Sequence, residues 1–340
     1  MQTLMKIGVP SFGELCNAIE ELSNMALDTV LNATLENSRK KLIMASLKSN
    51  ALMAWAFSTK RVEVENGGYN ITNPLTVGRN PTVGSYEYYD SVPVVETSEF
   101  DKVEYTWSRV AGTVIISDQE EDENKGETAV FKLMKAKLEV LEESIKEKFA
   151  SYLYGAGAGT DPLGLSALIP LDPTTGTLGG LNRATQQQWR TSSYVFGSGA
   201  ITSSNIEEVF DDVLMDLTLK GEKPDVIFCG RDLYRTYRAA VRDKLVINLG
   251  ELKKGKGMVD LGFSGISHDD IPIIYDEDCP VNTMYFINSK YLRVHMLSGV
   301  NMRVKNLTAP WTVDAVGKRI VWQGQYCMWR AYRTHAVVTG

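Results

Sequence analysis

The chain has 340 residues, a formal net charge of −6, and 44% apolar and 23% charged residues. This length suits one large domain or two ordinary ones with a sizeable core, and the composition is that of a globular protein. The acidic balance argues against a nucleic-acid reader that works by neutralising phosphates, although it leaves room for a local basic patch.

The four cysteines, Cys16, Cys229, Cys279 and Cys327, are scattered and show no C-x-x-C spacing. They do not make a disulfide framework, so we expect free thiols. The N-terminal segment lacks a signal-peptide design, and no run reaches the roughly 18 apolar residues that span a bilayer. We therefore expect a soluble intracellular protein with no membrane partner.

Residues 11–36 are predicted to form an amphipathic helix, because Ser11 and Glu14 fit a capping box and apolar residues then recur at helical spacing. A short helix is predicted at 39–47. From residue 53 to 117 the pattern becomes β-like. Val62 and Val64 alternate with charged residues and precede Asn66-Gly67-Gly68, which predicts a hairpin turn.

The next stretch, LTVGRNPTVGSYEYYDSVPVVET, is rich in Gly, Pro, Tyr and Thr and poor in large aliphatic residues. It predicts a long, exposed β-excursion that does not build a core alone. Better strands at 102–117 close it. Residues 118–154 are predicted to form a helix about 40 Å long that opens with clustered acids and ends at Gly155, with Gly126 as an alternative start.

Residues 155–200 are rich in loop signals, and from 201 the pattern turns α/β. The predicted elements are a helix at 206–219 capped by Asn205 or Ser204, a buried strand in PDVIFCG, a helix in RDLYRTYRAAVRD, and strands in IPIIY, MYFIN and YLRVHML. The tail at 319–338 predicts two strands joined near Gln323–Gly324.

No motif in the sequence is strong evidence for a ligand-binding or catalytic site. The stretch GELKKGKG (250–257) lacks the Ser or Thr of a P-loop and the helix that should follow. The stretch GTLGGLNRATQQQWRT (176–191) suggests a phosphate cradle or a stacking platform, but it has no helix with the right glycine spacing. We interpret it as a structural loop with a tight turn at Gly179-Gly180, with packaged DNA as a minority partner for Arg183 and Arg190.

Titratable residues give no catalytic constellation. In SHDD, His268 beside Asp269 or Asp270 suggests either a metal pair or a solvated turn, and the turn is favoured. The acids of YDEDCP (275–280) suggest a polar turn, and Cys279 next to them is expected to have a raised pKa. His295 is expected to be a core or edge histidine. We therefore assign no catalytic residue, metal or cofactor, and expect no enzyme.

Two segments carry a family resemblance. VAGTVIISDQEEDENKGETAVFKLMKAKLEVLEESIKEKFASYLYGAG resembles the strand and acid-capped spine helix of tailed-phage major capsid proteins of the Hong Kong 97-type fold. PLGLSALIP and the stretch at 176–191 resemble that family's GL and GG(I/L)xR…WR segments, with Thr191 where Asn is common. The order of the elements matches over nearly the whole chain.

The resemblance implies an α+β fold with an N-terminal arm at 1–50, a long β-hairpin (E-loop) with flanking strands at 51–117, and a spine helix with the peripheral domain at 118–200. An axial domain follows at 201–312, and a C-terminal β-pair at 313–340 returns to the peripheral domain. The expected contacts between subunits include Arg61, Glu63, Tyr69, Arg79, Tyr88, Arg183, Trp189 and Arg190.

The implied function is a structural subunit that self-assembles into pentamers and hexamers of an icosahedral shell around double-stranded DNA, which it contacts non-specifically. Expected partners are a portal, a possible decoration protein and a scaffolding protein, which we expect to be separate because no long helical region precedes the arm. The expected location is the virion capsid, and the host cytoplasm during assembly. The alternatives are an encapsulin-type cargo nanocompartment shell of the same fold and an uncharacterised α/β enzyme.

Overall fold

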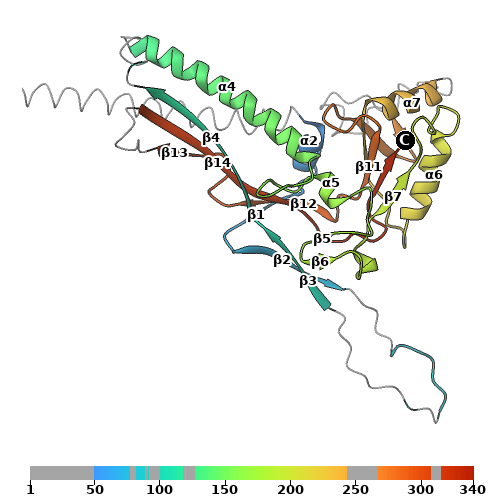
Figure 1. The fold of residues 1–340 in the computed structure, drawn as a ribbon. Helices are drawn as coiled ribbons and strands as arrows, with labels where there is room; N and C mark the ends of the chain where they lie inside the picture. The colour runs from blue at the N-terminus through green and yellow to red at the C-terminus, as the bar shows by residue number, and fades with distance from the viewer. Residues whose placement is uncertain are drawn as a thin grey trace, which may run out of the picture.

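The computed structural model describes residues 50–76, 82–88, 91, 100–117, 119, 127–242, 266–307 and 315–340. The helices expected at 11–36 and 39–47, the stretch 250–257 and Arg79 lie outside these ranges. The described residues form a mixed α+β fold (Figure 1), as the sequence predicts. Among the described helices, none is both long enough and apolar enough to cross a membrane.

The helical elements are α2 (Ala51–Ser58), α4 (Glu127–Leu153), α5 (Leu165–Leu168), the 3-10 turn η1 (Gln187–Trp189), α6 (Ile206–Leu217) and α7 (Arg231–Arg242). The strands up to residue 230 are β1 (Val62–Glu65), β2 (Asn70–Thr76), β3 (Phe100–Thr106), β4 (Ser108–Ser117), β5 (Thr177–Leu178), β6 (Leu181–Asn182), β7 (Ser192–Val195) and β8 (Val226–Cys229). The later strands are β9 (Ser267–His268), β10 (Ile271–Tyr275), β11 (Thr283–Ile287), β12 (Leu292–Leu297), β13 (Arg303–Leu307), β14 (Ala315–Met328) and β15 (Ala336–Thr339).

The long strand β14 organises the first sheet, which has five strands within the described residues. Antiparallel β4 pairs along one edge of β14 from Ala315 to Gly324. On the other edge, β13 pairs with the first half of β14 and β12 with the second half. Strand β1 then pairs in parallel with β12. Residues distant in the sequence therefore share one sheet.

The second sheet has six strands in the described part of the chain, in the order β7-β15-β11-β8-β10-β9. Its strand β8 is buried at all four positions. Ile227 packs in the cluster with Phe210 of α6 and Tyr237 of α7, whereas Phe228 packs on the other side, where Trp55 of α2 meets it edge-on at 5.8 Å. Burial on both faces explains the unbroken apolar run of this strand.

Helix α4 lies along the first sheet, as Figure 1 shows, and its contact with β4 is close. A Cβ on Gly112 of β4 would stand 2.6 Å from Leu141 Cδ1 and 3.2 Å from Ile145 Cδ1. Nearer its C-terminal end, Phe149 meets Trp322 of β14 edge-on at 4.9 Å. The absence of a side chain at Gly112 therefore sets the approach of the helix to the sheet.

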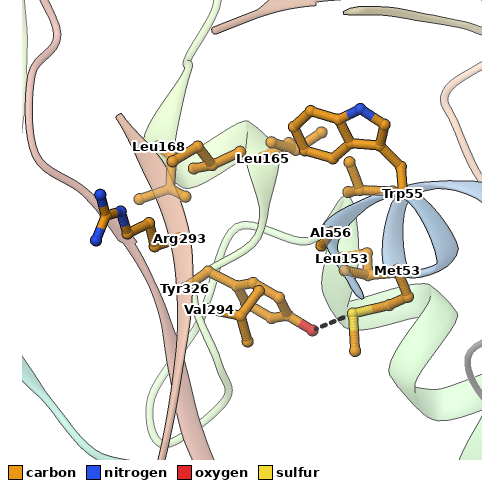
Figure 2. Close-up of a pocket in the computed structure, with 11 residues that line it drawn as sticks. Met53, Trp55, Ala56, Leu153, Leu165, Leu168, Arg293, Val294 and Tyr326 are labelled. Atoms are coloured by element: carbon orange, nitrogen blue, oxygen red, sulfur yellow. Dashed lines mark hydrogen bonds between the residues drawn. The ribbon is translucent and has the colours of Figure 1, made fainter. Parts of the chain in front are cut away.

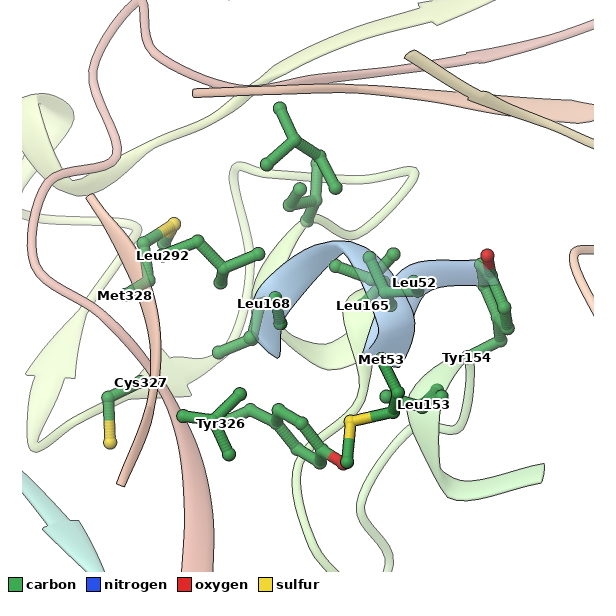
Figure 3. Packing of buried hydrophobic residues seen from close by; sticks show 14 of the residues in the cluster. Leu52, Met53, Leu153, Tyr154, Leu165, Leu168, Leu292, Tyr326, Cys327 and Met328 are labelled. Atoms are coloured by element: carbon green, nitrogen blue, oxygen red, sulfur yellow. The ribbon is translucent and has the colours of Figure 1, made fainter. Parts of the chain in front are cut away.

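Helix α2 corrects the sequence analysis, which predicts β-structure from residue 53. Its residues are apolar without a polar face, so the 3.6-residue period that marks a surface helix is missing. Asn50 stabilises the first turn, since its Oδ1 accepts hydrogen bonds from the N–H groups of Leu52 (3.0 Å) and Met53 (3.3 Å). Figure 3 shows α2 packed between the end of α4, α5 and the strands β12 and β14.

A cavity of about 20 Å³ remains inside this core (Figure 2). It is lined almost entirely by apolar side chains from α2, α4, α5, β12 and β14, and Tyr326 Oη lies 3.5 Å from Met53 Sδ at its wall. An apolar lining offers no polar partners to a water molecule. The cavity is a packing feature of the core.

The chain bends at Asn66-Gly67-Gly68, but the hairpin predicted around this turn is wrong. Strand β1 before the turn pairs with β12, and strand β2 after it pairs with β3. Gly67 and Gly68 have φ of 142° and 119°, outside the range of a two-residue hairpin turn, and they let the chain leave one sheet and start another. The hairpin in this region is β2–β3, whose two strands lie far apart in sequence.

The predicted break in the tail near Gln323–Gly324 is also wrong, because β14 runs unbroken through it. A Cβ on Gly324 would stand 2.7 Å from the carbonyl oxygen of His295 and 2.5 Å from Trp322. This glycine therefore allows a close backbone approach within the sheet. The chain turns after Met328 and enters β15 at Ala336.

Candidate assembly surfaces

The β2–β3 ribbon projects from the body of the molecule (Figure 1), and its root is firmly anchored. Val103 and Tyr105 are 1% and 2% exposed, and Tyr105 Oη donates a 2.8 Å hydrogen bond to the carbonyl oxygen of Met328. Beside the root, Trp107 Nε1 donates to the carbonyl oxygen of Gly68 at 3.0 Å. The ribbon is thus fixed in direction at its base.

Both at its base and beyond it, this segment exposes large apolar side chains to an unusual degree. Tyr69 and Tyr88 are 93% and 92% exposed. The other large apolar side chains of this segment that are mostly exposed are Val83 84%, Tyr86 69% and Phe100 71%. A two-stranded ribbon is marginal alone, and large exposed apolar side chains along it favour contact with a partner. Sequence analysis names Tyr69 and Tyr88 but misses Phe100, which begins a strand.

Arg61 and Glu63 are two further residues expected at contacts between subunits. Arg61 immediately precedes strand β1, and Glu63 lies within it. Glu63 forms an ion pair with Arg293 and lies 3.4 Å from His295 Nε2. Val64 is 63% exposed, whereas the Glu63 side chain is 38% exposed. Val62, on the same face of the strand as Val64, packs against the first core cluster, whereas Glu63 and Glu65 lie beside His295 on the other face. Arg61 is half-buried beside the strand.

The stretch 176–191 folds on its own chain. Gly179 and Gly180, with φ of 59° and 82°, form the tight turn between β5 and β6. Arg183 is 4% exposed and donates from one guanidinium nitrogen to the carbonyl oxygens of Ala167 (3.1 Å) and Leu168 (2.7 Å). Burial lowers the pKa of Arg183. A phosphate cradle needs exposed donors, so the structural interpretation of this loop fits the geometry.

The neighbouring Trp189 and Arg190 serve the same loop. Trp189 is 1% exposed, and its Nε1 donates to the carbonyl oxygen of Leu178 at 2.9 Å. Arg190 donates from Nε to the carbonyl oxygen of Arg183 (2.6 Å) and from another nitrogen to that of Ala184 (2.7 Å). These two residues therefore brace the loop within the chain.

His268 pairs with a residue that sequence analysis does not name. Its Nε2 lies 2.8 Å from Asp211 Oδ1 of α6, and its Nδ1 lies 3.1 Å from Tyr237 Oη of α7. Burial raises the pKa of Tyr237 to about 12, so the phenol is protonated at neutral pH. The contact joins β9 to both helices, and Asp269 instead pairs with Lys223.

The acids of 275–280 form a turn, as expected, but one of them is buried. Asp276 is 3% exposed and accepts hydrogen bonds from Tyr154 Oη (2.7 Å) and the N–H of Leu52 (3.3 Å). Burial raises the pKa of this carboxyl. It also raises the pKa of Cys279, with a smaller contribution from Asp276, as sequence analysis predicts. Asp276 therefore joins α2 and the end of α4 to the second sheet.

No family model and no curated protein matches the sequence. Among solved structures, the chain is similar to one in the cyanophage A-1(L) capsid asymmetric unit, with TM-score 0.60 and 16% identity, covering 82% of this chain and 90% of that chain. The fold of this chain is that of phage capsid proteins.

Two further solved structures agree with this capsid fold. The capsid of an empty GTA particle matches with TM-score 0.52 and 11% identity over 83% of this chain and 94% of that chain. The capsid of Myoviridae phage XM1 matches with TM-score 0.51 and 11% identity over 84% and 91%. At these identities the likeness concerns the fold.

Proposed function

We propose that this chain is a structural major capsid protein of a tailed phage, which self-assembles into pentamers and hexamers of an icosahedral shell enclosing double-stranded DNA. The observation that carries the proposal is the match to the cyanophage capsid chain, which covers most of both chains at TM-score 0.60. The exposed aromatic ribbon supports it, because a subunit built for assembly leaves surface for its neighbours.

Within this proposal the fold is of the Hong Kong 97 type. The arm is 1–50, the E-loop hairpin with its flanking strands is 51–117, and the spine helix with the peripheral domain is 118–200. The axial domain is 201–312, and 313–340 returns to the peripheral domain. Strands β12 and β13 of the 201–312 range pair with β14 in the first sheet, so the proposed axial domain shares strands with its neighbour.

The proposed partners are other copies of the chain, a portal, a separate scaffolding protein, a possible decoration protein and, non-specifically, packaged DNA. The proposed location is the virion capsid, with assembly in the host cytoplasm. Inter-subunit contacts are proposed at the exposed residues Tyr69 and Tyr88 and at Arg79. Arg183 and Trp189 are buried in their own chain and would act on assembly through the shape of the loop.

An encapsulin-type shell of the same fold is the nearest rival, and an α/β enzyme is the more distant one. The solved cyanophage, phage XM1 and GTA structures that the chain resembles at TM-scores of 0.50 to 0.60 are capsids, which favours the phage shell. The buried state of Arg183 and of Asp276 favours a structural role for both motifs that suggested chemistry.

Assembly is the decisive test. The full-length chain, purified at high concentration, is expected to form pentamers, hexamers or shells in sedimentation velocity and negative-stain electron microscopy. A chain that stays a monodisperse monomer under these conditions contradicts the proposal. A thermal shift with small metabolites and no shell would favour the enzyme instead.

Two tyrosine variants test whether the β2–β3 ribbon carries a contact surface for assembly. Tyr69→Ser removes a side chain that is 93% exposed, so we expect reduced assembly with the unfolding free energy changed by less than about 0.5 kcal/mol. Tyr105→Phe, at the buried root of the same ribbon, removes the hydrogen bond to Met328 and is expected to lower stability by about 1 kcal/mol. Equal effects of both variants on folding and assembly would contradict the division into root and contact surface.

A further inference from the structure

Strand β1 places two carboxylates and an imidazole on one side of the first sheet. Glu63 and Glu65 are two residues apart, so their side chains leave the same face. Glu63 is in register with His295 of the parallel neighbour β12. One ligand atom from each of Glu63, Glu65 and His295 lies within 4.8 Å of the other two.

The imidazole of His295 is held in one orientation. The side chain is 2% exposed and meets the ring of Trp329 edge-on at 5.1 Å. Its Nδ1 lies 3.3 Å from Glu65 Oε1 in a hydrogen bond. Donation of the Nδ1 proton to Glu65 leaves a lone pair on Nε2.

The Nε2 atom is buried and unsatisfied. Across the described part of the chain it has no hydrogen-bond partner, and the nearest carboxylate atom, Glu63 Oε2, lies 3.4 Å away without hydrogen-bond geometry. A buried polar nitrogen without a partner is costly and calls for an explanation. Ligands at about 2.1 Å from a tetrahedral metal ion are about 3.4 Å apart, so this separation suits chelation of one ion.

The three side chains line a polar cavity of about 400 Å³ between β1, β2 and β12. Asn70 also lines it, and its buried Oδ1 is a second acceptor without a hydrogen-bond donor among the described residues. The cavity leaves room for the water molecules that complete a coordination shell. A carboxylate and imidazole donor set, with a carboxylate holding the far side of the imidazole, is typical of zinc-type ions.

The charges around the cavity favour a cation. Glu63 and Glu65 supply two negative charges, and the ion pair of Glu63 Oε1 with Arg293 offsets one of them. Oxygen Oε2 of Glu63 then faces His295. Together with Arg293, the three side chains therefore keep one net negative charge while the imidazole is neutral.

We propose that Glu63 and His295 Nε2 bind a divalent zinc-type cation, with Glu65 holding the imidazole from its Nδ1 side. The ion would tie β1 to β12 at the point where the chain leaves the first sheet for the projecting ribbon. The site involves residues of one chain, so it does not depend on shell formation, and its test is separate from that of the capsid proposal.

Equilibrium dialysis followed by metal analysis tests the site. The full-length chain, stripped with a chelator and dialysed against Zn²⁺, is expected to retain about one ion per subunit, with Mg²⁺ and Ca²⁺ retained far more weakly. Glu63→Gln and His295→Gln are expected to abolish retention, and Glu65→Gln to weaken it at least about tenfold. Retention of no zinc by the unmodified chain overturns the proposal.

Asp211→Asn is the matched control, because it removes the carboxylate of another histidine–carboxylate pair in the described part of the chain, His268–Asp211. It is expected to leave zinc retention unchanged. Glu65→Gln is the variant least prone to misfold, because the Glu65 side chain is 44% exposed. Without metal, its melting temperature should lie within a few degrees of that of the unmodified chain. Zinc retention by folded Glu65→Gln equal to that of the unmodified chain, or loss of retention in Asp211→Asn alone, overturns the assignment.

Discussion

A buried histidine next to the last strand makes the stability of the subunit depend on pH. His335 is 0% exposed, and its Nδ1 accepts a 3.3 Å hydrogen bond from the N–H of Asn288. Burial lowers its pKa from 6.5 to about 3, so the folded chain keeps the ring neutral where the unfolded chain protonates it. The stabilising contribution is present above pH 6.5 and is lost as the pH falls toward 3.

The size of the effect follows from the two pKa values. Each pH unit between them changes the free energy of unfolding by about 1.4 kcal/mol. At about pH 7.5 the ring is neutral in both states and contributes almost nothing to the pH dependence. At about pH 5 the loss is about 2 kcal/mol, a large share of the stability of an ordinary domain.

Urea unfolding of dissociated subunits at these two pH values measures the effect, with the variant His335→Asn as the comparison. Asparagine retains an acceptor near the Nδ1 position and leaves a cavity whose cost does not vary with pH. Acidification should therefore destabilise the unmodified chain by about 2 kcal/mol more than the variant. Equal acid-induced losses in the two chains would refute the assignment of this pH dependence to His335.

Two further predictions concern the packing around a glycine and a buried hydrogen bond of a tryptophan. In Gly164→Ala, the new Cβ would stand 2.3 Å from the backbone oxygen of Tyr152, which cannot easily move, so we expect a loss of about 3 kcal/mol by urea unfolding. Gly197→Ala, where no atom lies within 4 Å, should change stability by less than about 1 kcal/mol, and similar losses in both would disprove the packing argument. Trp189→Phe leaves the buried carbonyl of Leu178 without its donor and should cost about 2 kcal/mol. Trp107→Phe removes a similar but exposed bond and should cost less; the reverse order would contradict the reasoning.

Elements with a strong local pattern could be predicted from the sequence. Helix α6 begins directly after Asn205, as predicted. Helix α7 and the buried strand β8 also lie where their apolar patterns predict them. Helix α4 ends two residues before Gly155, close to the predicted end. In each case the period of apolar residues and the capping or breaking residue agree, so the local signal suffices.

Pairing between distant segments could not be predicted in the same way. Strand β1 finds its partner β12 more than two hundred residues later, and only that pairing turns Glu63 and Glu65 toward His295. The local alternation of β1 places Val62 and Val64 on one face and the two acids on the other, but it does not show which strand lies beside the acids. The sequence therefore names Glu63 as an interfacial charge but does not reveal the group it forms with His295.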